Sequence, residues 1–162
     1  MKTLLLGDVC PAGKATELYE KGGTDKLFKR TRELFCDKDF ALVNLECAIT
    51  DSSFMIKKYG PNLKAPEKTA DVLKELGVDL CGLSNNHIFD FGVEGYEDTM
   101  KNLNRVGIAT TGFGKNLEDS KKEFVIEKNG ERICIIAVCE HEYTYALPDR
   151  MGSCPFDEFE TP

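Results

Sequence analysis

The sequence predicts an α/β fold in which a mainly parallel sheet of βαβ units is flanked by helices. Short apolar runs, typical of buried strands, alternate along the chain with amphipathic stretches that repeat at helical spacing. Their order is strand, helix, strand, helix, strand, helix, strand, which is typical of a right-handed βαβ sheet. The chain has 162 residues, and a chain of about 150 residues buries about 70% of its unfolded surface. We therefore expect a single domain, residues 1–162, with its own hydrophobic core.

The first part of the chain predicts two strands and one helix. Residues 3–6 form a short apolar run that ends at a glycine, as a buried strand does. Residues 24–35 place apolar side chains at helical spacing, and Thr24 can cap the N-terminus of that helix. A second apolar run at residues 40–43 predicts the next strand. Residues 51–65 are polar and contain a Gly-Pro pair, which predicts an irregular loop.

The middle of the chain predicts two helices around a third strand. Pro66 suits the first position of a helix, and Gly77 is placed just past its end. Residues 78–83 are apolar and predict the third strand. Residues 93–106 predict a second amphipathic helix, which Gly107 ends.

A β-hairpin is predicted after the last helix. Residues 123–128 and 131–138 are joined by Asn129 and Gly130, a strong signal for a tight turn. A short strand at residues 108–111 precedes the hairpin. The C-terminal segment contains prolines and a glycine and predicts no regular element.

The charge of the chain argues against two classes of partner. Its 21 Lys+Arg and 28 Asp+Glu give a net charge of −7, and no run of basic residues occurs. We therefore expect no nucleic-acid partner and no anionic membrane surface as a partner. No apolar run approaches the length of about 20 residues that a membrane span needs, so we expect no span. A phosphate-bearing substrate stays compatible with this charge, because a bound metal supplies local positive charge.

Seven cysteines occur without any Cys-x-x-Cys pair, which argues against a zinc ribbon and a thioredoxin-like site. The N-terminus has only three leucines before its first acidic residue, too short an apolar stretch for a secretory signal. We therefore expect a cytoplasmic protein with reduced thiols and no disulfide, most of the cysteines being buried. Burial is expected in particular for Cys47, Cys81, Cys134 and Cys139.

Polar side chains follow each predicted strand. In an open α/β sheet, ligands bind outside the carboxyl ends of the strands. Carboxylates, amides and an imidazole on separate loops suit Mg, Mn, Fe or Zn better than a soft metal. These residues are Asp8 after the first strand, Asn44 and Glu46 after the second, Asn85, Asn86, His87 and Asp90 after the third, and Glu140, His141 and Glu142 after the hairpin.

Several of these residues have a structural alternative. Asp8 can be a helix cap, and Asn44 and Glu46 can be turn residues. Asp90 can simply start the next helix, and His141 can lie in a solvated loop. The polar triplet that follows the third strand has no equally simple structural role. The combination of all these positions therefore favours a functional site.

The polar residues belong to three motifs, which are Gly7-Asp8-Val9, Asn44-Leu45-Glu46 and Asn85-Asn86-His87-x-x-Asp90-x-Gly92. These motifs resemble those of the bacterial capsule-synthesis CapA family, which is linked to poly-γ-glutamate synthesis. The resemblance runs from the first residues to about Val138, and its third motif is fairly specific. That family is similar to the calcineurin-like metallophosphoesterases. The resemblance thus implies the N-terminal part of an αββα sandwich with a dinuclear metal centre.

The resemblance also implies roles for single residues. Asp8, Glu46 and Asn86 match metal-ligand positions for one or two Mn, Fe, Zn or Mg ions, and His87 matches the catalytic histidine. The implied activity is a metal-dependent phosphoesterase acting on a small or polymeric phosphate or acidic substrate. The alternative is a non-enzymatic member of the capsule machinery that binds a polymer or a partner. Substrate-binding or supporting positions are Asn44, Asn85, Asp90 and His141.

The chain departs from the larger superfamily in its histidines. It has only His87 and His141, whereas the superfamily uses further histidines in a late Gly-His-x-His-like element. We therefore expect an incomplete metal site, in the N-terminal part of a longer CapA-like domain. The hairpin at residues 123–138 should then expose an apolar face that a missing C-terminal half, or a second copy in a homodimer, covers. A dinucleotide-binding domain lacks its spaced glycines here, and a Gly-Asp-Ser hydrolase lacks its serine.

Overall fold

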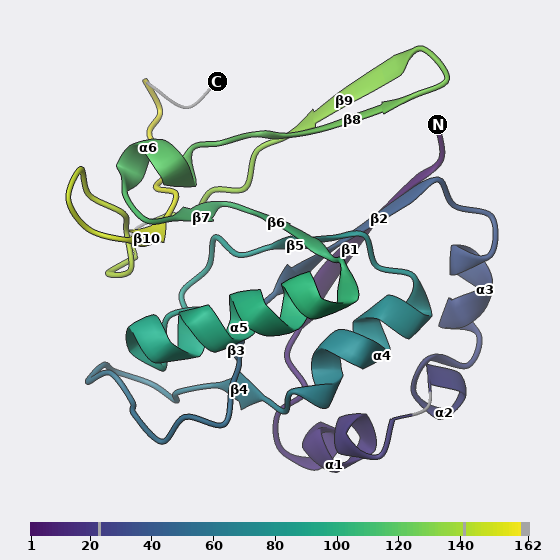
Figure 1. Cartoon of the computed structure of the whole chain (residues 1–162), viewed down its shortest axis with the longest axis horizontal. Helices are drawn as coiled ribbons and strands as arrows, with labels where there is room; N and C mark the ends of the chain where they lie inside the picture. Colours follow the sequence, from purple (N-terminus) through teal and green to yellow (C-terminus); the bar gives the residue numbers. More distant parts are fainter. Residues whose placement is uncertain (23, 141, 160–162) are drawn as a thin grey trace.

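Four parallel strands form the central sheet of the protein, in the order β1-β2-β5-β6. The computed structural model describes residues 1–22, 24–140 and 142–159. The strands of this sheet are β1 (Thr3–Val9), β2 (Phe40–Leu45), β5 (Leu80–Gly82) and β6 (Ala109–Thr111). Helices flank the sheet (Figure 1). The predicted α/β fold with a mainly parallel sheet is therefore confirmed.

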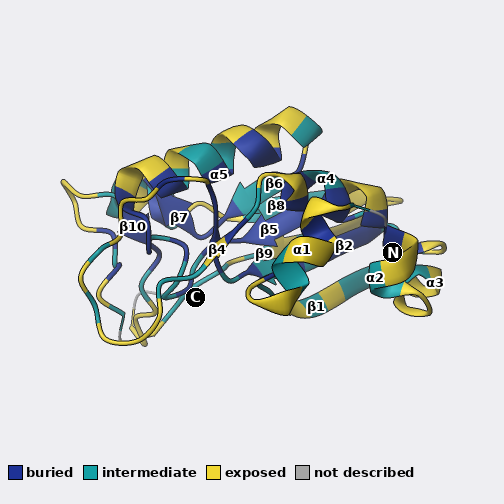
Figure 2. Ribbon diagram, turned by 90° about the horizontal axis from the view of Figure 1, so that it is seen from below, coloured by how far each residue is buried: buried dark blue, intermediate teal, exposed yellow. Residues whose placement is uncertain are grey.

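Two amphipathic helices, α4 (Lys68–Leu76) and α5 (Gly92–Val106), cover one face of the sheet. Both lie on the same side of it, with their buried residues turned toward the strands (Figure 2). Helix α4 ends at Gly77 (φ 98°) and α5 ends at Gly107 (φ 69°). A left-handed residue at this position favours glycine, so the sequence predicted both helix ends correctly.

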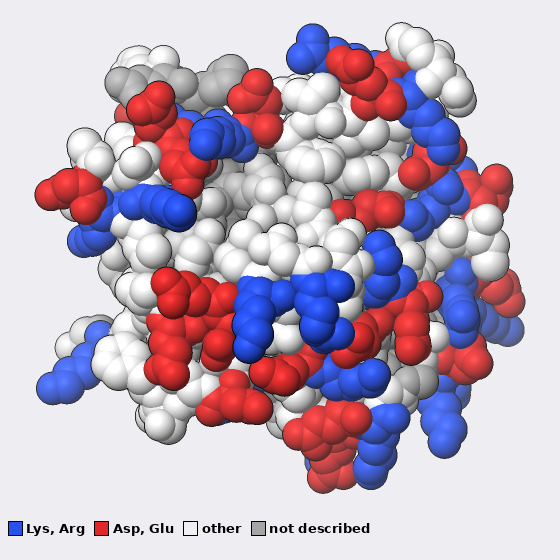
Figure 3. Space-filling model, viewed as in Figure 1, with Lys and Arg blue, Asp and Glu red and all other residues white. Residues whose placement is uncertain are grey.

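The outer surfaces of α4 and α5 are charged. Arg105 on α5 donates to both carboxylate oxygens of Asp71 on α4, at 2.9 and 3.1 Å. Acidic and basic side chains are intermixed over these two helices (Figure 3). This face of the molecule therefore presents a mixed surface, without a continuous basic patch.

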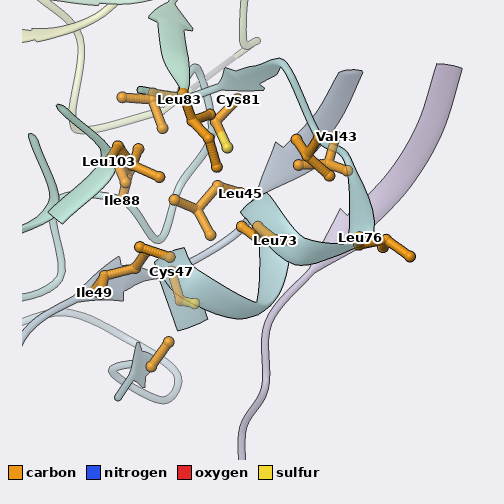
Figure 4. Packing of buried hydrophobic residues seen from close by; sticks show 14 of the residues in the cluster. Val43, Leu45, Cys47, Ile49, Leu73, Leu76, Cys81, Leu83, Ile88 and Leu103 are labelled. Atoms are coloured by element: carbon orange, nitrogen blue, oxygen red, sulfur yellow. The ribbon is translucent and has the colours of Figure 1, made fainter. Parts of the chain in front are cut away.

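The hydrophobic core lies between the sheet and these helices. Ala41, Val43 and Leu45 alternate along β2 and are 0%, 2% and 0% exposed. They pack with Leu73 from α4 and Leu103 from α5, which are both fully buried (Figure 4). The alternation follows from the two-residue period of a strand, and the helical spacing brings its partners to the same layer.

The N-terminal crossover differs from its prediction. The single helix expected over residues 24–35 is divided, because Lys29 between the two parts has a positive φ of 33°. Thr24 is the first residue of the second helix of the chain, and its hydroxyl accepts a hydrogen bond from Arg32 Nη1 at 2.9 Å. One further helix precedes it and was not predicted. The three helices are α1 (Lys14–Glu20), α2 (Thr24–Phe28) and α3 (Thr31–Phe35).

Besides the β-hairpin, two small sheets lie outside the central one in the part of the chain that the structure describes. Strand β3 (Ala48–Ile49) pairs in parallel with β4 (Lys64–Ala65). Only β4 lies inside the segment 51–65 that was predicted as an irregular loop. Strand β7 (Phe113–Gly114) pairs antiparallel with β10 (Gly152–Ser153), in the C-terminal segment for which no element was predicted. The short helix α6 (Leu117–Ser120) follows β7. Two-residue strands carry no periodic pattern that a sequence could reveal.

The predicted hairpin is confirmed. It consists of β8 (Phe124–Lys128) and β9 (Glu131–Ile135), joined by Asn129 (φ 55°) and Gly130 (φ 79°). Both turn residues have positive φ, as a two-residue hairpin turn of this type requires. The second strand is three residues shorter than the predicted 131–138.

The hairpin packs against the other face of the sheet. Phe124 stacks on Phe40 of β2, with ring centroids 5.8 Å apart, and Lys128 Nζ lies 2.6 Å from Asp39 Oδ1. Leu5 on the edge strand β1 is 74% exposed, although its neighbours on either side pack against the core. The second face of the sheet is therefore only partly covered.

The cysteines are less buried than predicted. Cys134 is exposed and Cys139 is only half-buried, so the predicted burial of these two was wrong. Cys134 pairs with Val125 in the hairpin, on the side opposite to the one that carries Phe124. That side faces away from the sheet, which explains its exposure. All seven cysteines are free thiols, and the buried ones are Cys47, Cys81 and Cys154.

Candidate functional site

Four of the polar residues predicted for the site are joined at the carboxyl end of the central sheet, namely Asp8, Asn44, Glu46 and Asn85. Asp8 pairs with Asn44 across β1 and β2, and Asn44 pairs with Gly82 across β2 and β5. Both Asp8 and Asn44 lie within their strands, because these strands extend beyond the predicted apolar runs. Asp8 lies where the β1–β2 register shifts, between Leu5 and Asp8. The sheet therefore places these polar groups side by side.

One amide group joins the two carboxylates. Asn44 Nδ2 donates to Asp8 Oδ1 at 2.8 Å and also donates to Glu46 Oε2. Its oxygen accepts a hydrogen bond from Asn85 Nδ2 at 3.1 Å. This acceptor role fixes the orientation of the Asn44 side chain, so its NH₂ group faces both carboxylates.

Asn85, which orients the side chain of Asn44, is itself held by hydrogen bonds to the backbone. Its side-chain oxygen accepts from the backbone N–H groups of His87 (3.1 Å) and Ile88 (2.9 Å). Its Nδ2 also donates to the carbonyl of Leu45 at 2.9 Å. A buried amide with all its functions satisfied is a rigid support. The chain of hydrogen bonds thus runs from the loop after β5 through two asparagines to Asp8 and Glu46.

Three side chains of the C-terminal segment donate hydrogen bonds to backbone carbonyls of the loop after β5. Tyr143 OH donates to the carbonyl of Asn86 at 3.0 Å. Thr144 Oγ1 and Ser153 Oγ donate to the carbonyl of Asn85, at 3.5 and 3.3 Å. No signal in the sequence indicated these three hydroxyl residues, because they are far from the loop along the chain.

His87 forms a second polar cluster together with Asp90 and Lys58. The Nδ1 atom of His87 lies 2.7 Å from Asp90 Oδ2 and 3.1 Å from Lys58 Nζ. Lys58 Nζ also donates to Asp90 Oδ1. The side chains of Lys58, Asp90 and His87 are 4%, 0% and 15% exposed. Sequence reasoning missed Lys58, since nothing distinguishes it from the adjacent lysine.

Asp90 does not start helix α5. The helix begins at Gly92, and its N-terminus has no side-chain cap. The side-chain carboxylate of Asp90 accepts a hydrogen bond from the backbone N–H of Leu63 at 2.7 Å. The backbone carbonyl of Asp90 accepts hydrogen bonds from Ile56 N and Asn62 Nδ2, both at 3.0 Å. The interpretation of Asp90 as a helix start is therefore wrong, and Asp90 anchors the loop between β3 and β4.

Burial raises the pKa of Glu46, an effect that the hydrogen bond from Asn44 opposes and that the nearby charge of Asp8 reinforces. The charges of His87 and Glu142 also act on this carboxyl, with opposite signs. Glu140 lines a different pocket with Tyr145 and Phe156. His141 lies outside the described residues.

Two cysteines flank the carboxylates along the chain. Cys10 lies two residues after Asp8, and Cys47 directly follows Glu46. A hydrogen bond between the two thiols raises the pKa of Cys47, which burial raises further, and lowers the pKa of Cys10. The sulfur of Cys47 also lies 3.9 Å from the carbonyl oxygen of Val9. Cys47 belongs to the hydrophobic core cluster, and the partly buried Cys10 packs against that cluster.

The residues fit a divalent cation only in part. Carboxylate and amide oxygens are the ligand types that Mg and Mn prefer. Within the described ranges, however, no group of three or more His, Cys, Asp or Glu side chains is arranged to hold a metal ion. Asn44 also presents its NH₂ group to the two carboxylates, not its oxygen. Asp8 and Glu46 thus need further donors, and Asn86 is the candidate in the adjoining loop.

Curated relatives show what the chain is similar to. A relative from Bacillus anthracis, named capsule biosynthesis protein CapA, is 26% identical over 135 residues, which are 82% of this chain and 33% of that protein. A relative from Bacillus subtilis strain 168, named PGA biosynthesis protein CapA, is 26% identical over 133 residues, 81% of this chain and 35% of that protein. The chain spans about a third of the length of these curated relatives.

A third relative, from Mycobacterium tuberculosis strain H37Rv, is named a probable polyglutamine synthesis accessory protein. It is 34% identical over 99 residues, which are 60% of this chain and 26% of that protein. In the part of the chain that the structure describes, no helix is long and apolar enough to span a membrane. A family model described as bacterial capsule synthesis protein PGA_cap matches residues 2–156, which include every residue of the site. The chain therefore belongs to the PGA_cap family of bacterial capsule synthesis proteins.

Proposed function

We propose that this chain supplies a metal-dependent phosphoesterase-like site to a CapA-like protein of capsule or poly-glutamate synthesis. The observation that carries the proposal is the pair of carboxylates, Asp8 and Glu46, joined through Asn44 at the carboxyl end of a parallel sheet. Such edges are where open α/β folds bind their ligands. The names of the relatives support the role in capsule and poly-glutamate synthesis.

In this proposal, Asp8, Glu46 and Asn86 hold one or two Mg, Mn, Fe or Zn ions. A bound divalent ion supplies Lewis-acid polarisation of a phosphoryl oxygen and a more acidic water. Asn44 keeps the two carboxylates at a fixed separation, and Asn85 keeps Asn44 in place. His87 offers its imidazole to the substrate or to the leaving group. The substrate class is a small or polymeric phosphate or another acidic group.

A second candidate is a non-enzymatic site that binds an acidic polymer or a protein partner. The orientation of Asn44 favours this alternative, since its NH₂ group already satisfies both carboxylates. The absence of a three-donor group within the described ranges points the same way. The two candidates differ in their need for a cation.

Calorimetric titration of the full-length protein with Mn²⁺, together with hydrolysis of p-nitrophenyl phosphate, separates the two, because the described residues supply only part of a metal site. We expect saturable Mn²⁺ binding and metal-dependent hydrolysis, both lost in Asp8→Asn and in Glu46→Gln. Asp39→Asn is the matched control, because Asp39 pairs with Lys128 at the hairpin. Binding and hydrolysis that are unchanged in both site variants, or absent from the wild type, contradict the phosphoesterase proposal.

A further inference from the structure

The turn of the β-hairpin contains the one asparagine of the chain that precedes a glycine. Of the eight asparagines in the sequence, only Asn129 is followed by such a residue, Gly130. The side-chain amide of asparagine is labile, because the main-chain nitrogen of the next residue attacks it and closes a five-membered ring. A glycine at that next position has no Cβ to hinder the attack. Asn129 is therefore the asparagine whose local sequence favours this reaction most.

The structure leaves both reacting groups accessible. Residues 127–132 are exposed, and the turn lies at the free end of the hairpin (Figure 1). Apart from its chain neighbours, no described residue comes within 4 Å of the position that a Cβ of Gly130 would occupy. Among the described residues, none forms a hydrogen bond with the side-chain amide of Asn129. Neither steric cover nor hydrogen bonding thus protects this amide.

The closed turn nevertheless restrains the reaction. Asn129 and Gly130 have φ angles of 55° and 79°, and the residues on either side, Lys128 and Glu131, pair directly with each other. Ring closure requires the nitrogen of Gly130 to rotate toward the side chain of Asn129, about a main-chain bond that this pairing restricts. A two-stranded hairpin is only marginally stable by itself, so local opening releases that bond.

We propose that Asn129 is a deamidation site that reacts from the opened hairpin, and that its isoaspartate product releases the hairpin from the sheet. In the first step, the nitrogen of Gly130 forms a bond to Cγ of Asn129, and the bond between Cγ and the amide nitrogen breaks. The proton of the attacking nitrogen leaves with the amide group as ammonia. Water then opens the ring at either carbonyl, which gives aspartate or isoaspartate.

The two products differ in their effect on the hairpin. In isoaspartate the main chain runs through the former side chain, which adds one carbon atom to the turn. A two-residue turn fixes the hairpin register, so this added atom disrupts the pairing of Lys128 with Glu131. The hairpin is held to the central sheet by the ion pair of Lys128 with Asp39 and by the stacking of Phe124 on Phe40. Loss of the register therefore weakens both contacts.

Peptide mapping by mass spectrometry, after prolonged incubation of the full chain at mildly alkaline pH, measures the reaction. We expect the mass gain of an amide-to-acid conversion at Asn129, well ahead of the other asparagines. Phe124→Ala should speed this conversion roughly 10-fold, since a factor of ten corresponds to about 1.4 kcal/mol of opening free energy. Leu34→Ala is the control, because Leu34 is 56% exposed on α3, and it should leave the rate unchanged.

Hydrogen exchange of β8 and β9 measures the effect on the hairpin. The isoaspartate form, separated by chromatography from the unreacted chain, should lose the protection of these backbone amides. Asn129→Asp is the matched control, because it adds the same negative charge without lengthening the main chain, and it should retain the protection. Asn129→Gly lacks the reactive amide but keeps a favourable turn, so incubation should leave its exchange unchanged.

Three results overturn the proposal. One is an Asn129 that reacts no faster than the other asparagines. Another is an equal rate in Phe124→Ala and the wild type, because the reaction would then not depend on opening. The third is full protection of β8 and β9 in the isoaspartate form. If Phe124→Ala fails to fold, Phe124→Leu decides instead, since it loses the ring contact and keeps apolar bulk, and an unchanged rate overturns the proposal.

None of the residues in this proposal belongs to the candidate site at the carboxyl end of the sheet. The reaction needs only water and the chain itself, without a metal ion. Failure of the Mn²⁺ titration would therefore refute the proposed function and leave the deamidation of Asn129 untouched.

Discussion

The two faces of the central sheet are covered in different ways. On the helix side, Val43 and Leu45 are 2% and 0% exposed beneath two long amphipathic helices. On the hairpin side, Phe40 is covered by the ring of Phe124, whereas Leu5 is 74% exposed. Successive side chains of β1 thus meet different environments, because Leu4 packs against the core and Leu5 is exposed. The stability of the fold should therefore depend mostly on the helix side.

The two sides also differ in how far their local sequence alone specifies their structure. The helices α4 and α5 have their own periodicity and glycine ends, so the local sequence indicates where each helix ends and which of its faces is buried. The hairpin has only two strands, which alone are marginally stable in water. It gains stability from contacts such as that of Phe124 with Phe40.

The largest effect is expected for Leu73→Ala on α4. Leu73 is fully buried in the core cluster, so truncation removes apolar contacts and leaves a cavity. We expect a loss of about 3 kcal/mol in the free energy of unfolding, measured by urea titration. Leu34→Ala is the control, because Leu34 is 56% exposed, and it should change that free energy by less than about 0.5 kcal/mol. Equal losses would contradict the assignment of the core.

A smaller effect is expected for Phe124→Ala on the hairpin. Phe124 is only half-buried, so its loss should cost about 1 to 2 kcal/mol of unfolding free energy, including the aromatic contact. A double-mutant cycle with Phe40→Ala should give a coupling of about 0.5 to 1.5 kcal/mol. A cost above that of Leu73→Ala would mean that the hairpin side dominates stability.

At the carboxyl end of the central sheet, we predict that Glu46 makes stability depend on pH in the opposite direction to a surface ion pair. Burial raises the pKa of Glu46, so its ionised form destabilises the fold, and stability rises as pH falls through that pKa. Glu46→Gln should therefore be slightly more stable than the wild type at pH 7, an advantage that disappears near pH 4.

Asp71 provides the comparison for this effect. Its hydrogen bond with Arg105 lowers the pKa of Asp71, so its stabilisation is present above the unfolded pKa and is lost as pH falls through the folded one. Asp71→Asn should be slightly less stable than the wild type at pH 7. Thermal unfolding across this pH range measures both variants, and the same sign for both would refute the assignment for Glu46.

The smallest effect is expected for Leu5→Thr. Because Leu5 is mostly exposed, the change should shift the free energy of unfolding by less than about 0.5 kcal/mol. It should also increase solubility, since β1 is an edge strand of the sheet. Light scattering at increasing protein concentration measures this. A large loss of stability would show that Leu5 is covered in solution, for example by a second copy of the chain.

The sequence predicted those parts of the structure that have a local cause. Gly77 and Gly107 end their helices through left-handed backbone, and Asn129 with Gly130 forms the hairpin turn, so periodicity and turn chemistry were sufficient. The strand pairs β3–β4 and β7–β10 join segments distant in sequence. Their short pairing depends on the completed fold, which no local pattern records.

The same distinction applies to the site. Asp8, Asn44 and Glu46 could be placed together, because parallel strands end at one edge of a sheet. Lys58 could not be found, because only the folded loop distinguishes it from the adjacent lysine by burying it against Asp90. Whether these residues bind a metal and hydrolyse phosphate stays a prediction.

The bracing of the loop after β5 has a consequence for biosynthesis. The carbonyl of Asn85 is held by Thr144 and Ser153, which lie 59 and 68 residues further along the chain. A nascent chain that has released β6 from the ribosome already contains all four strands of the central sheet. It still lacks the hydroxyl groups that hold Asn85, and hence the support that Asn85 gives to Asn44. During translation, the sheet can therefore form before its carboxyl end, which carries Asp8 and Asn44, acquires its final geometry.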